Sequence, residues 1–431
     1  MSRLITICAL ALVLSFGGTA CAKNDDAPWQ EDLSAFLEVL HAEHDNPYFH
    51  TPRAEFELAI ADYRAALPGL SRAERIIGFA RLVAMVGDGH TWMPMYGLPF
   101  DGLPPGPVFS SLPIRFELFD DGLYVVGASH SHADLLGARV TRFGDVPAKQ
   151  AIARVMELLP QDATNFAREF VGEWLMQVEL LEALGLAASN LVTVSLQRGG
   201  ESRAVDLTAL DDGALYDWVY STDGGPAGQQ AWQTATEQQP FWMQGFDGHF
   251  RIAELEGATY FQIKTISDGV DLTFANMAQA AVTRAEAREE PALILDLRRC
   301  LGGDGTLNEG LVNALAESDM LNTDGRLMVL TSRSTHSAAV MLVSALEQRT
   351  TARFIGQATA DRPNHYGETN IFVTPNSALP IIYASEYYQT STPDDQRRFR
   401  APDIAVSYTF ADYVAGTDAV LETALNQIKG E

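Results

Sequence analysis

The sequence contains few basic side chains. Its 431 residues include 30 Lys and Arg against 56 Asp and Glu, a formal net charge of −26 at pH 7. Proteins that bind nucleic-acid phosphates need the opposite sign of charge, and an anionic membrane surface would repel this chain. We therefore expect no nucleic-acid partner. The length, with 47% hydrophobic and 20% charged residues, predicts a globular protein of about two or three domains.

Cysteine is also rare, and the whole chain has three: Cys8, Cys21 and Cys300. The first two lie in an N-terminal segment that we expect to be removed or modified, so Cys300 has no partner. No intrachain disulfide is therefore predicted. A chain of this length can build its hydrophobic core without such cross-links.

The N-terminus predicts export. Arg3 is followed by the apolar stretch LITICALALVLSFGG and then by small residues, which is typical of a signal peptide over residues 1–22 and short for a membrane span, since that needs about 20 apolar residues. Two interpretations stay open. Ala20-Cys21-Ala22 fits a signal-peptidase site, while the residues up to Cys21 resemble a bacterial lipobox. We expect a periplasmic protein, or a lipoprotein anchored at the outer membrane through lipidated Cys21.

Three regions follow the signal segment. Residues 28–96 have helical patterns, including a capping box from Ser71 to Glu74. Residues 105–212 alternate like strands around two helical stretches, which predicts a small α+β module. In residues 245–431 strands alternate with helices, which predicts an α/β layered structure.

Three polar segments follow regular elements in this pattern. They are VGDGHTWM with His90, LILDLRRCLGGDGT with Gly302 and Gly303, and TSRSTHSAAV with Ser337. Each is expected to form a loop at the end of a helix or strand. Functional sites of layered α/β proteins usually lie in such loops.

Ser337 follows a predicted strand at 327–331 and precedes a predicted helix at 338–348. Two interpretations remain open: an ordinary helix N-cap, or a nucleophile beside the unpaired N–H groups of a helix start. A serine hydroxyl needs a base within hydrogen-bond reach and donors for the developing oxyanion. Ala338, together with Gly302 or Gly303, can supply backbone N–H donors. The neighbouring His336 is expected to point elsewhere.

The segments DGHT, DLRxxxGG, TxSAA, GQATADRPNHYGE and APDI occur here in an order that resembles the C-terminal-processing (tail-specific) protease and tricorn-core family of serine peptidases. The resemblance implies a ClpP/crotonase-like core at about 245–431, with the middle module in the PDZ-like position. It also implies a peptide or protein substrate and no cofactor. The interphotoreceptor retinoid-binding protein belongs to the same family, so a binding protein without turnover is an alternative.

The general base is predicted by comparison with the two branches of this family. Tail-specific proteases use a lysine shortly after the serine, but Arg362 occupies that place, and arginine stays protonated. The chain has only four lysines, and none lies between Ser337 and residue 428. The tricorn branch uses a histidine from the segment that matches DGHT. The resemblance therefore implies His90 as base for Ser337, and the pKa of histidine suits this role.

A carboxylate should orient the histidine. In the tricorn branch it lies a few residues before a Pro-Asp pair near the C-terminus and acts through a serine beside the histidine. Gly89 occupies that serine's place here. The first candidate is Asp395, followed by Asp394 and Glu386, with Asp88 as the local alternative.

Two further motifs are assigned no function. HSHAD, at residues 130–134, has zinc-binding residue types, but no downstream cluster completes a ligand set, so we expect a polar hairpin loop and no metal. GGDG lacks the lysine and hydroxyl of a phosphate-binding loop. The sequence thus predicts an exported serine peptidase without metal or organic cofactor. A non-peptide serine esterase is a further alternative, and the oligomeric state stays open.

Overall fold

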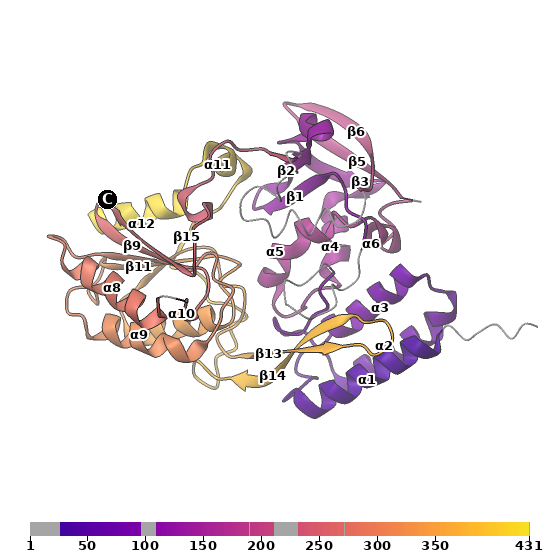
Figure 1. The fold of residues 1–431 in the computed structure, drawn as a ribbon, viewed down its shortest axis with the longest axis horizontal. Helices are drawn as coiled ribbons and strands as arrows, with labels where there is room; N and C mark the ends of the chain where they lie inside the picture. The colour runs from indigo at the N-terminus through magenta and orange to yellow at the C-terminus, as the bar shows by residue number, and fades with distance from the viewer. Residues whose placement is uncertain (1–25, 96–108, 189, 211–231, 271, 431) are drawn as a thin grey trace, which may run out of the picture.

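The computed structural model describes residues 26–95, 109–188, 190–210, 232–270 and 272–430 (Figure 1). The signal segment 1–22, with Cys21, and the Gly/Pro-rich stretch 97–107 lie outside these ranges, so what was expected of them stays a prediction. Within the described ranges, none of the helices combines the length and apolar character that crossing a membrane requires.

The N-terminal region is a set of packed helices. Its elements are α1 (Ala27–Glu43), α2 (Arg53–Ala66), the 3₁₀-helix η1 (Leu67–Gly69) and α3 (Arg72–Ala84). The predicted capping box starts α3: Ser71 Oγ accepts the N–H of Glu74 at 3.3 Å, and the Glu74 carboxylate accepts the N–H of Ser71 at 2.8 Å. Beyond α3 the chain turns at Gly87, whose φ is 99°. This turn starts the loop that carries His90.

The middle module is a seven-stranded sheet with helices. The strand order is β1-β2-β3-β5-β6, with β4 on β3 and β7 on β2. The strands are β1 (Ile114–Phe119), β2 (Gly122–Ser129), β3 (Arg139–Phe143), β4 (Val146–Pro147), β5 (Leu191–Arg198), β6 (Glu201–Thr208) and β7 (Trp232–Thr234). The helices are η2 (His130–Leu135), α4 (Ala148–Met156), α5 (Thr164–Trp174) and α6 (Val178–Ala183). The HSHAD segment is thus a 3₁₀-helix between β2 and β3, where we expected a hairpin loop.

The C-terminal region is built on a six-stranded sheet of order β15-β12-β11-β10-β9-β8, parallel except for the β8–β9 pair. The strands are β8 (Phe250–Leu255), β9 (Ala258–Ile263), β10 (Leu293–Asp296), β11 (Leu327–Thr331), β12 (Arg353–Gly356) and β15 (Ile404–Ala405). The helices are η3 (Phe241–Met243), α8 (Phe274–Glu286), η4 (Gly305–Leu307), α9 (Asn308–Glu317), α10 (Ala338–Arg349), α11 (Phe410–Ala415) and α12 (Ala419–Lys429).

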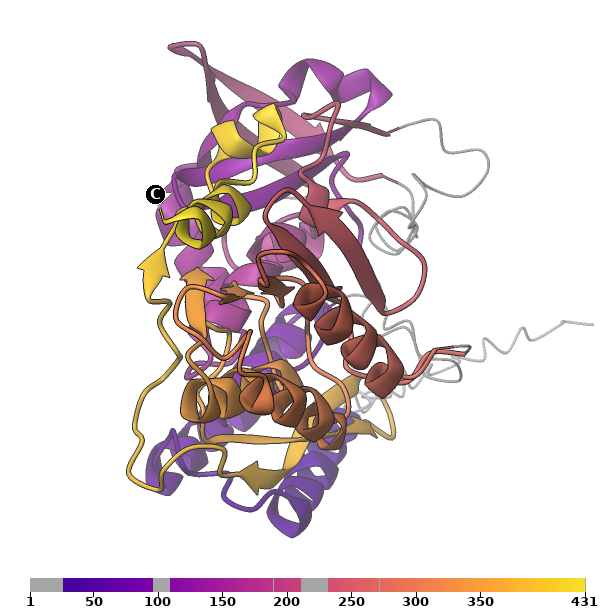
Figure 2. The same ribbon diagram turned by 90° about the vertical axis from the view of Figure 1, so that its left-hand side faces the viewer.

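Helices cover both faces of this sheet (Figure 2). In β10, Leu293 and Leu295 pack with α8, α9 and α10, whereas Ile294 between them packs on the other face with Val420 of α12. Both faces are therefore apolar, which accounts for the uninterrupted hydrophobic runs of β10 and β11. The predicted α/β class is confirmed.

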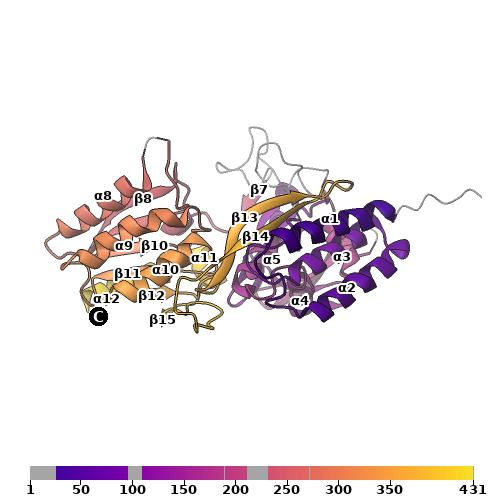
Figure 3. The same cartoon turned by 90° about the horizontal axis from the view of Figure 1, so that it is seen from below.

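A long hairpin of β13 (His365–Val373) and β14 (Pro380–Tyr388) connects the two ends of the molecule, and Figure 3 shows it extending from the C-terminal sheet toward α1. Phe372 packs on Phe36 of α1 with ring centroids 6.2 Å apart. Trp92, two residues after His90, forms an antiparallel bridge with Ile382 in β14. This hairpin holds the His90 loop against the C-terminal region.

Candidate active site

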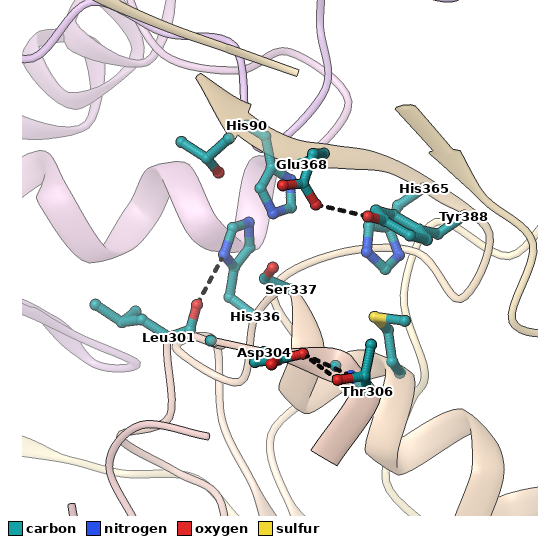
Figure 4. Close-up of a pocket in the computed structure, with 13 residues that line it drawn as sticks. His90, Leu301, Asp304, Thr306, His336, Ser337, His365, Glu368 and Tyr388 are labelled. Atoms are coloured by element: carbon teal, nitrogen blue, oxygen red, sulfur yellow. Dashed lines mark hydrogen bonds between the residues drawn. The ribbon is translucent and has the colours of Figure 1, made fainter. Parts of the chain in front are cut away.

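A cavity of about 580 Å³ lies where these loops meet (Figure 4). Its walls come from the His90 loop, from the loop after β10, from the start of α10 and from the β13–β14 hairpin. The lining residues are His90, Leu301, Gly303, Asp304, Gly305, Thr306, His336, Ser337, Met341, His365, Glu368, Thr369 and Tyr388. The structure thus brings Ser337 and His90, 247 positions apart by their numbers, to one cavity.

Ser337 lies on a strained turn between β11 and α10. Its backbone has φ 53° and ψ −127°, a conformation that non-glycine residues rarely adopt. It occupies the N-cap position of α10, but its hydroxyl makes no capping hydrogen bond. The turn is fixed from within, because Thr335 Oγ1 donates to the Leu297 carbonyl at 3.0 Å and accepts the Ser332 N–H at 2.9 Å. Such strain at a strand-to-helix turn is typical of nucleophilic serines and does not fit an ordinary cap.

The glycine pair in front of Ser337 cannot be replaced without displacing its neighbours. Gly302 has φ 117°, and a Cβ on it would lie 2.6 Å from the Cβ of Ser337 and 3.2 Å from the Ala338 nitrogen. Gly303 has φ 131°, and its Cβ would lie 2.1 Å from the Ile266 carbonyl oxygen. Within the described residues, the N–H groups of Gly303 and Ala338 have no backbone acceptor, whereas the Gly302 N–H interacts with the Cys300 sulfur. The N–H groups of Gly303 and Ala338 can therefore serve a developing oxyanion beside the serine.

The loop that carries His90 is held by Asp88. One Asp88 oxygen accepts the backbone N–H of His90 at 2.8 Å, and the other lies 3.1 Å from His44 Nε2. Asp88 therefore positions the loop and is not paired with the imidazole. The His90 side chain is buried, at 3% exposure, and neither ring nitrogen pairs with another side chain, although the ring interacts with the Tyr366 backbone carbonyl.

The carboxylate that faces the His90 ring is Asp361, which the sequence analysis missed. Its Oδ2 lies 3.7 Å from His90 Nδ1 and 3.7 Å from His336 Nε2. Asp361 follows β12, and this segment is tied to the serine turn because the Ala360 N–H donates to the Thr335 carbonyl at 2.9 Å. One feature of the sequence could have pointed to Asp361. It precedes Arg362, which lies in the segment where tail-specific proteases have their lysine.

The carboxylates that we expected to orient His90 lie elsewhere. Asp395 forms an ion pair with Arg397 at 2.7 Å, and Arg397 also binds Glu347 at 2.9 Å. Glu386 is an exposed residue of β14, and Asp394 is exposed as well. Among the described residues, none of the three pairs with His90. Asp395 does not pair with His90 because Arg397, two positions further along the chain, binds its carboxylate.

Gly89 explains why the serine relay of the tricorn branch is absent. A Cβ on Gly89 would lie 2.8 Å from Asp361 Oδ2 and 2.9 Å from His336 Nε2. Asp361 and His336 therefore fill the space that a serine side chain would need. The Asp361 carboxyl faces His90 directly here, with Oδ2 3.7 Å from Nδ1 and no hydroxyl between them.

Two more histidines border His90. The ring of His336 stacks on it with centroids 4.3 Å apart, so our expectation that His336 points away from the site is wrong. Its Nδ1 lies 3.3 Å from the Leu301 carbonyl oxygen. His365 lies nearly parallel to His90, with ring centroids 5.7 Å apart.

Burial sets the protonation states of this cluster. It lowers the pKa of His90 well below its usual value, with further lowering by His336 and His365. It likewise lowers the pKa of His336 to about 3 and also lowers that of His365. Burial acts in the opposite direction on Asp361 and raises its pKa to about 8. A neutral imidazole next to Ser337 is the form that can accept a proton.

Neither Arg362 nor Cys300 is among the residues that line the cavity. The Arg362 guanidinium binds Asp162 at 2.5 Å. Cys300 is fully buried, and burial raises the pKa of its thiol to about 12, so it is an unreactive core residue.

The sequence matches no family model and no curated protein. The fold, in contrast, is similar to that of CPAF in three solved structures. Mature CPAF in complex with lactacystin matches with a TM-score of 0.63 and 12% sequence identity, over 94% of this chain and 100% of that one. Mature CPAF alone matches with a TM-score of 0.59 and 13% identity, over 94% and 98% of the two chains. A CPAF serine-to-alanine mutant matches with a TM-score of 0.60 and 12% identity, over 93% and 97%.

Proposed function

We propose that this protein is a serine peptidase with Ser337 as nucleophile, His90 as general base and Asp361 as the carboxylate that orients His90. The observation that carries the proposal is the strained backbone of Ser337, with φ 53°, in a cavity that it shares with a buried, neutral His90. The fold shared with CPAF supports it.

In the first step Ser337 Oγ attacks the carbonyl carbon of a peptide bond while His90 takes its proton. The ring accepts this proton on Nε2 when Nδ1 carries the other proton and points to Asp361. The present 3.7 Å between His90 Nδ1 and Asp361 Oδ2 must shorten to about 3 Å for a hydrogen bond, as catalytic contacts often do when substrate binds. Burial keeps the Asp361 carboxyl largely protonated near neutral pH, so it releases its proton as positive charge develops on His90, and the carboxylate then stabilises the imidazolium.

The oxyanion that forms is bound by backbone N–H groups. Ala338 donates from the start of α10, and Gly302 or Gly303 donates from the facing loop. Each such donor is worth about 100- to 1,000-fold in rate. Protonation of the leaving amine by His90 gives an acyl-enzyme on Ser337. A water molecule activated by the same imidazole then releases the product and restores the serine.

The substrate class is a peptide or protein, and the site of action is outside the cytoplasm. The second statement depends on the N-terminal sequence, in which residues 1–22 have the features of an export signal and Cys21 those of a lipidated residue. Mass spectrometry of the protein purified from its host membrane and periplasm tests it. A mature N-terminus at Cys21 with an attached diacylglycerol supports the lipoprotein, and an unmodified N-terminus near residue 23 supports a soluble exported protein.

A fluorophosphonate probe tests the catalytic assignment directly. The wild-type protein should be labelled on Ser337, Ser337→Ala should not be labelled, and His90→Ala should be labelled far more slowly. Lactacystin, which is bound in one CPAF structure, provides a competitor for the same experiment. A folded wild-type protein that the probe does not label at Ser337 would leave only a binding protein on a peptidase fold.

A further inference from the structure

We propose that His90, His336 and Asp361 form a binding site for a zinc ion, and that zinc in this site switches the peptidase off. Binding of the metal depends only on these three side chains. The inhibitory effect rests on the function proposed above.

The three donor atoms already have nearly the spacing of a metal site. Asp361 Oδ2 lies 3.7 Å from His90 Nδ1 and 3.7 Å from His336 Nε2, and one ligand atom from each residue lies within 4.8 Å of the others. Neighbouring donors of a tetrahedral zinc ion with bonds of about 2.0–2.1 Å are roughly 3.3 Å apart. Shifts of a few tenths of an ångström to roughly one ångström would bring these atoms to that geometry.

No other side chain pairs with these atoms, and the Gly89 backbone carbonyl is the further group that interacts with the His336 ring. His90 Nδ1, His336 Nε2 and Asp361 Oδ2 are buried and make no hydrogen bond within the described residues. The three residues are 3%, 5% and 3% exposed. A buried polar atom without a partner costs about 1–3 kcal/mol, so three that converge on one point need an explanation. A cation bound between them satisfies all three.

Surrounding groups fix part of the ligand arrangement, while the stacked rings of His90 and His336, with planes 27° apart, must rotate for both lone pairs to meet one zinc ion. The Nδ1–H of His336 points to the Leu301 carbonyl at 3.3 Å, which leaves the lone pair on Nε2 directed at Asp361. The other oxygen of Asp361 accepts the backbone N–H of Arg362 at 2.9 Å. Zinc ligands in proteins are typically fixed by such second contacts. Two imidazoles and one carboxylate form a common donor set for zinc, with a water molecule as the usual fourth ligand.

The HSHAD segment also has zinc-binding residue types, but its side chains differ from those of His90, His336 and Asp361 in already having partners. His132 Nδ1 lies 2.8 Å from Ser129 Oγ, and Asp134 forms an ion pair with Arg203 at 2.7 Å. Its potential ligands are therefore engaged with other side chains. In the part of the chain that the structure describes, His90, His336 and Asp361 are the one group of three such residues whose donor atoms converge.

Zinc at this site is incompatible with base catalysis by His90. Peptide hydrolysis requires a proton on Nδ1 and a free lone pair on Nε2. Zinc on Nδ1 displaces the Nδ1 proton, and the neutral ring then carries its proton on Nε2, the nitrogen that we assign to proton transfer with Ser337. That tautomer cannot accept the proton of Ser337. Zinc also takes the Asp361 carboxylate away from its role of stabilising the imidazolium.

The binding experiment uses the full mature chain, stripped of metal, titrated with zinc in competition with a chromophoric chelator. One zinc ion should bind to the wild type, and Ser337→Ala should bind equally well. His336→Ala and Asp361→Asn should each weaken binding by more than about tenfold, since loss of a ligand exceeds loss of an outer contact. His132→Ala is the matched control and should bind like the wild type. Zinc should also raise the melting temperature of the wild type, and not that of the two ligand variants.

Inhibition is measured separately with the fluorophosphonate probe. Zinc should slow labelling of the wild type, and a chelator should restore it, whereas labelling of His336→Ala should be insensitive to zinc. If the protein binds zinc but is never labelled, the peptidase proposal fails and the zinc site stands. The zinc site is overturned if the wild type binds no zinc, or if His336→Ala and Asp361→Asn bind it as tightly as the wild type.

Discussion

The imidazole of His336 stacks on that of His90, with ring centroids 4.3 Å apart and planes 27° apart, and its other face stacks on Phe166 at 4.1 Å. Two histidines therefore lie beside the serine, and only one can be its base. The Nδ1 of His336 is engaged with a backbone carbonyl and its Nε2 is directed at Asp361, so we assign it a positioning role.

His336→Phe tests this assignment, because a phenyl ring keeps the stack between Phe166 and His90 but has no nitrogen. We expect kcat/KM to fall by less than about tenfold, whereas His90→Ala should lose roughly 100- to 10,000-fold, the range of general-base catalysis. The measurement is hydrolysis of a peptide substrate under metal-free conditions. Equal losses in the two variants would show that His336 takes part in proton transfer.

Asp361→Asn separates the orienting carboxylate from the candidates near the C-terminus. Burial raises the pKa of Asp361, so the folded protein tolerates an uncharged side chain there and the variant should fold. We expect kcat to fall up to about 10⁴-fold, as when the carboxylate of a serine-peptidase triad is replaced by an amide, with little change in KM. Asp395→Asn is the comparison. It removes an ion pair with Arg397 and should leave kcat unchanged, and a large loss of kcat in this variant would reinstate Asp395.

Much of this fold could be predicted from the sequence, because its signals are local. The strand Leu327–Thr331 and the capping box at Ser71 lie where apolar runs and cap residues indicated them. The motif residues Ser337 and His90 likewise follow from their places at the ends of elements. Asp361 was missed because its role depends on a contact with a residue 271 positions earlier by number, which no local pattern encodes. The path of the β13–β14 hairpin to α1 escaped prediction for the same reason.

Gly302→Ala should abolish most activity. Its Cβ would lie 2.6 Å from that of Ser337, and its φ of 117° is unfavourable for alanine. The serine or the oxyanion donors must shift, so we expect a loss of at least about 100-fold in kcat. Gly310→Ala is the matched control, since Gly310 lies in α9 with no atom within 4 Å of the added Cβ. That variant should keep full activity and gain roughly 0.5–1 kcal/mol of stability. Full activity in Gly302→Ala would exclude this loop from the site.

The buried histidines predict sensitivity to acid. The pKa values of His90, His336 and His365 are all lowered by burial, so below about pH 6.5 the unfolded chain binds protons that the folded protein does not. The free energy of unfolding contributed by each group therefore decreases as pH falls below 6.5, by up to about 1.4 kcal/mol per pH unit. Asp361, with its raised pKa, contributes the opposite slope between about pH 4 and 8.

The variant His365→Asn isolates the contribution of one histidine to the pH dependence of stability. An asparagine amide can keep the contact that His365 Nδ1 makes with the Pro363 carbonyl at 3.1 Å, but it does not titrate. Urea unfolding of the wild type and the variant at pH 7, 6 and 5, with chelator present, gives the change in free energy of unfolding with pH for each protein. We expect the variant to lose less stability on acidification, by up to about 1.4 kcal/mol per pH unit. Equal slopes would mean that His365 is protonated in the folded protein as readily as in the unfolded chain.

The charge of the cavity predicts a preference for cationic substrates. Its lining includes the carboxylates Asp304 and Glu368, and no lysine or arginine among the described residues. Glu368 is exposed and accepts a hydrogen bond from the Tyr388 hydroxyl at 2.7 Å, which holds its charge at the rim. Peptides with a lysine or arginine beside the cleaved bond should therefore have a lower KM than neutral analogues, and the difference should shrink at high salt.

Glu368→Gln keeps the contact with Tyr388 and removes the charge. For cationic peptides we expect KM to rise roughly two- to fivefold, because an exposed charge pair is worth up to about 1 kcal/mol. For neutral peptides KM should stay the same, and kcat should not change for either class because Glu368 is not assigned a role in proton transfer. The comparison uses matched peptides that differ only in lysine against its uncharged acetylated form. Equal effects on both peptides would show that Glu368 acts through the shape of the cavity and not through its charge.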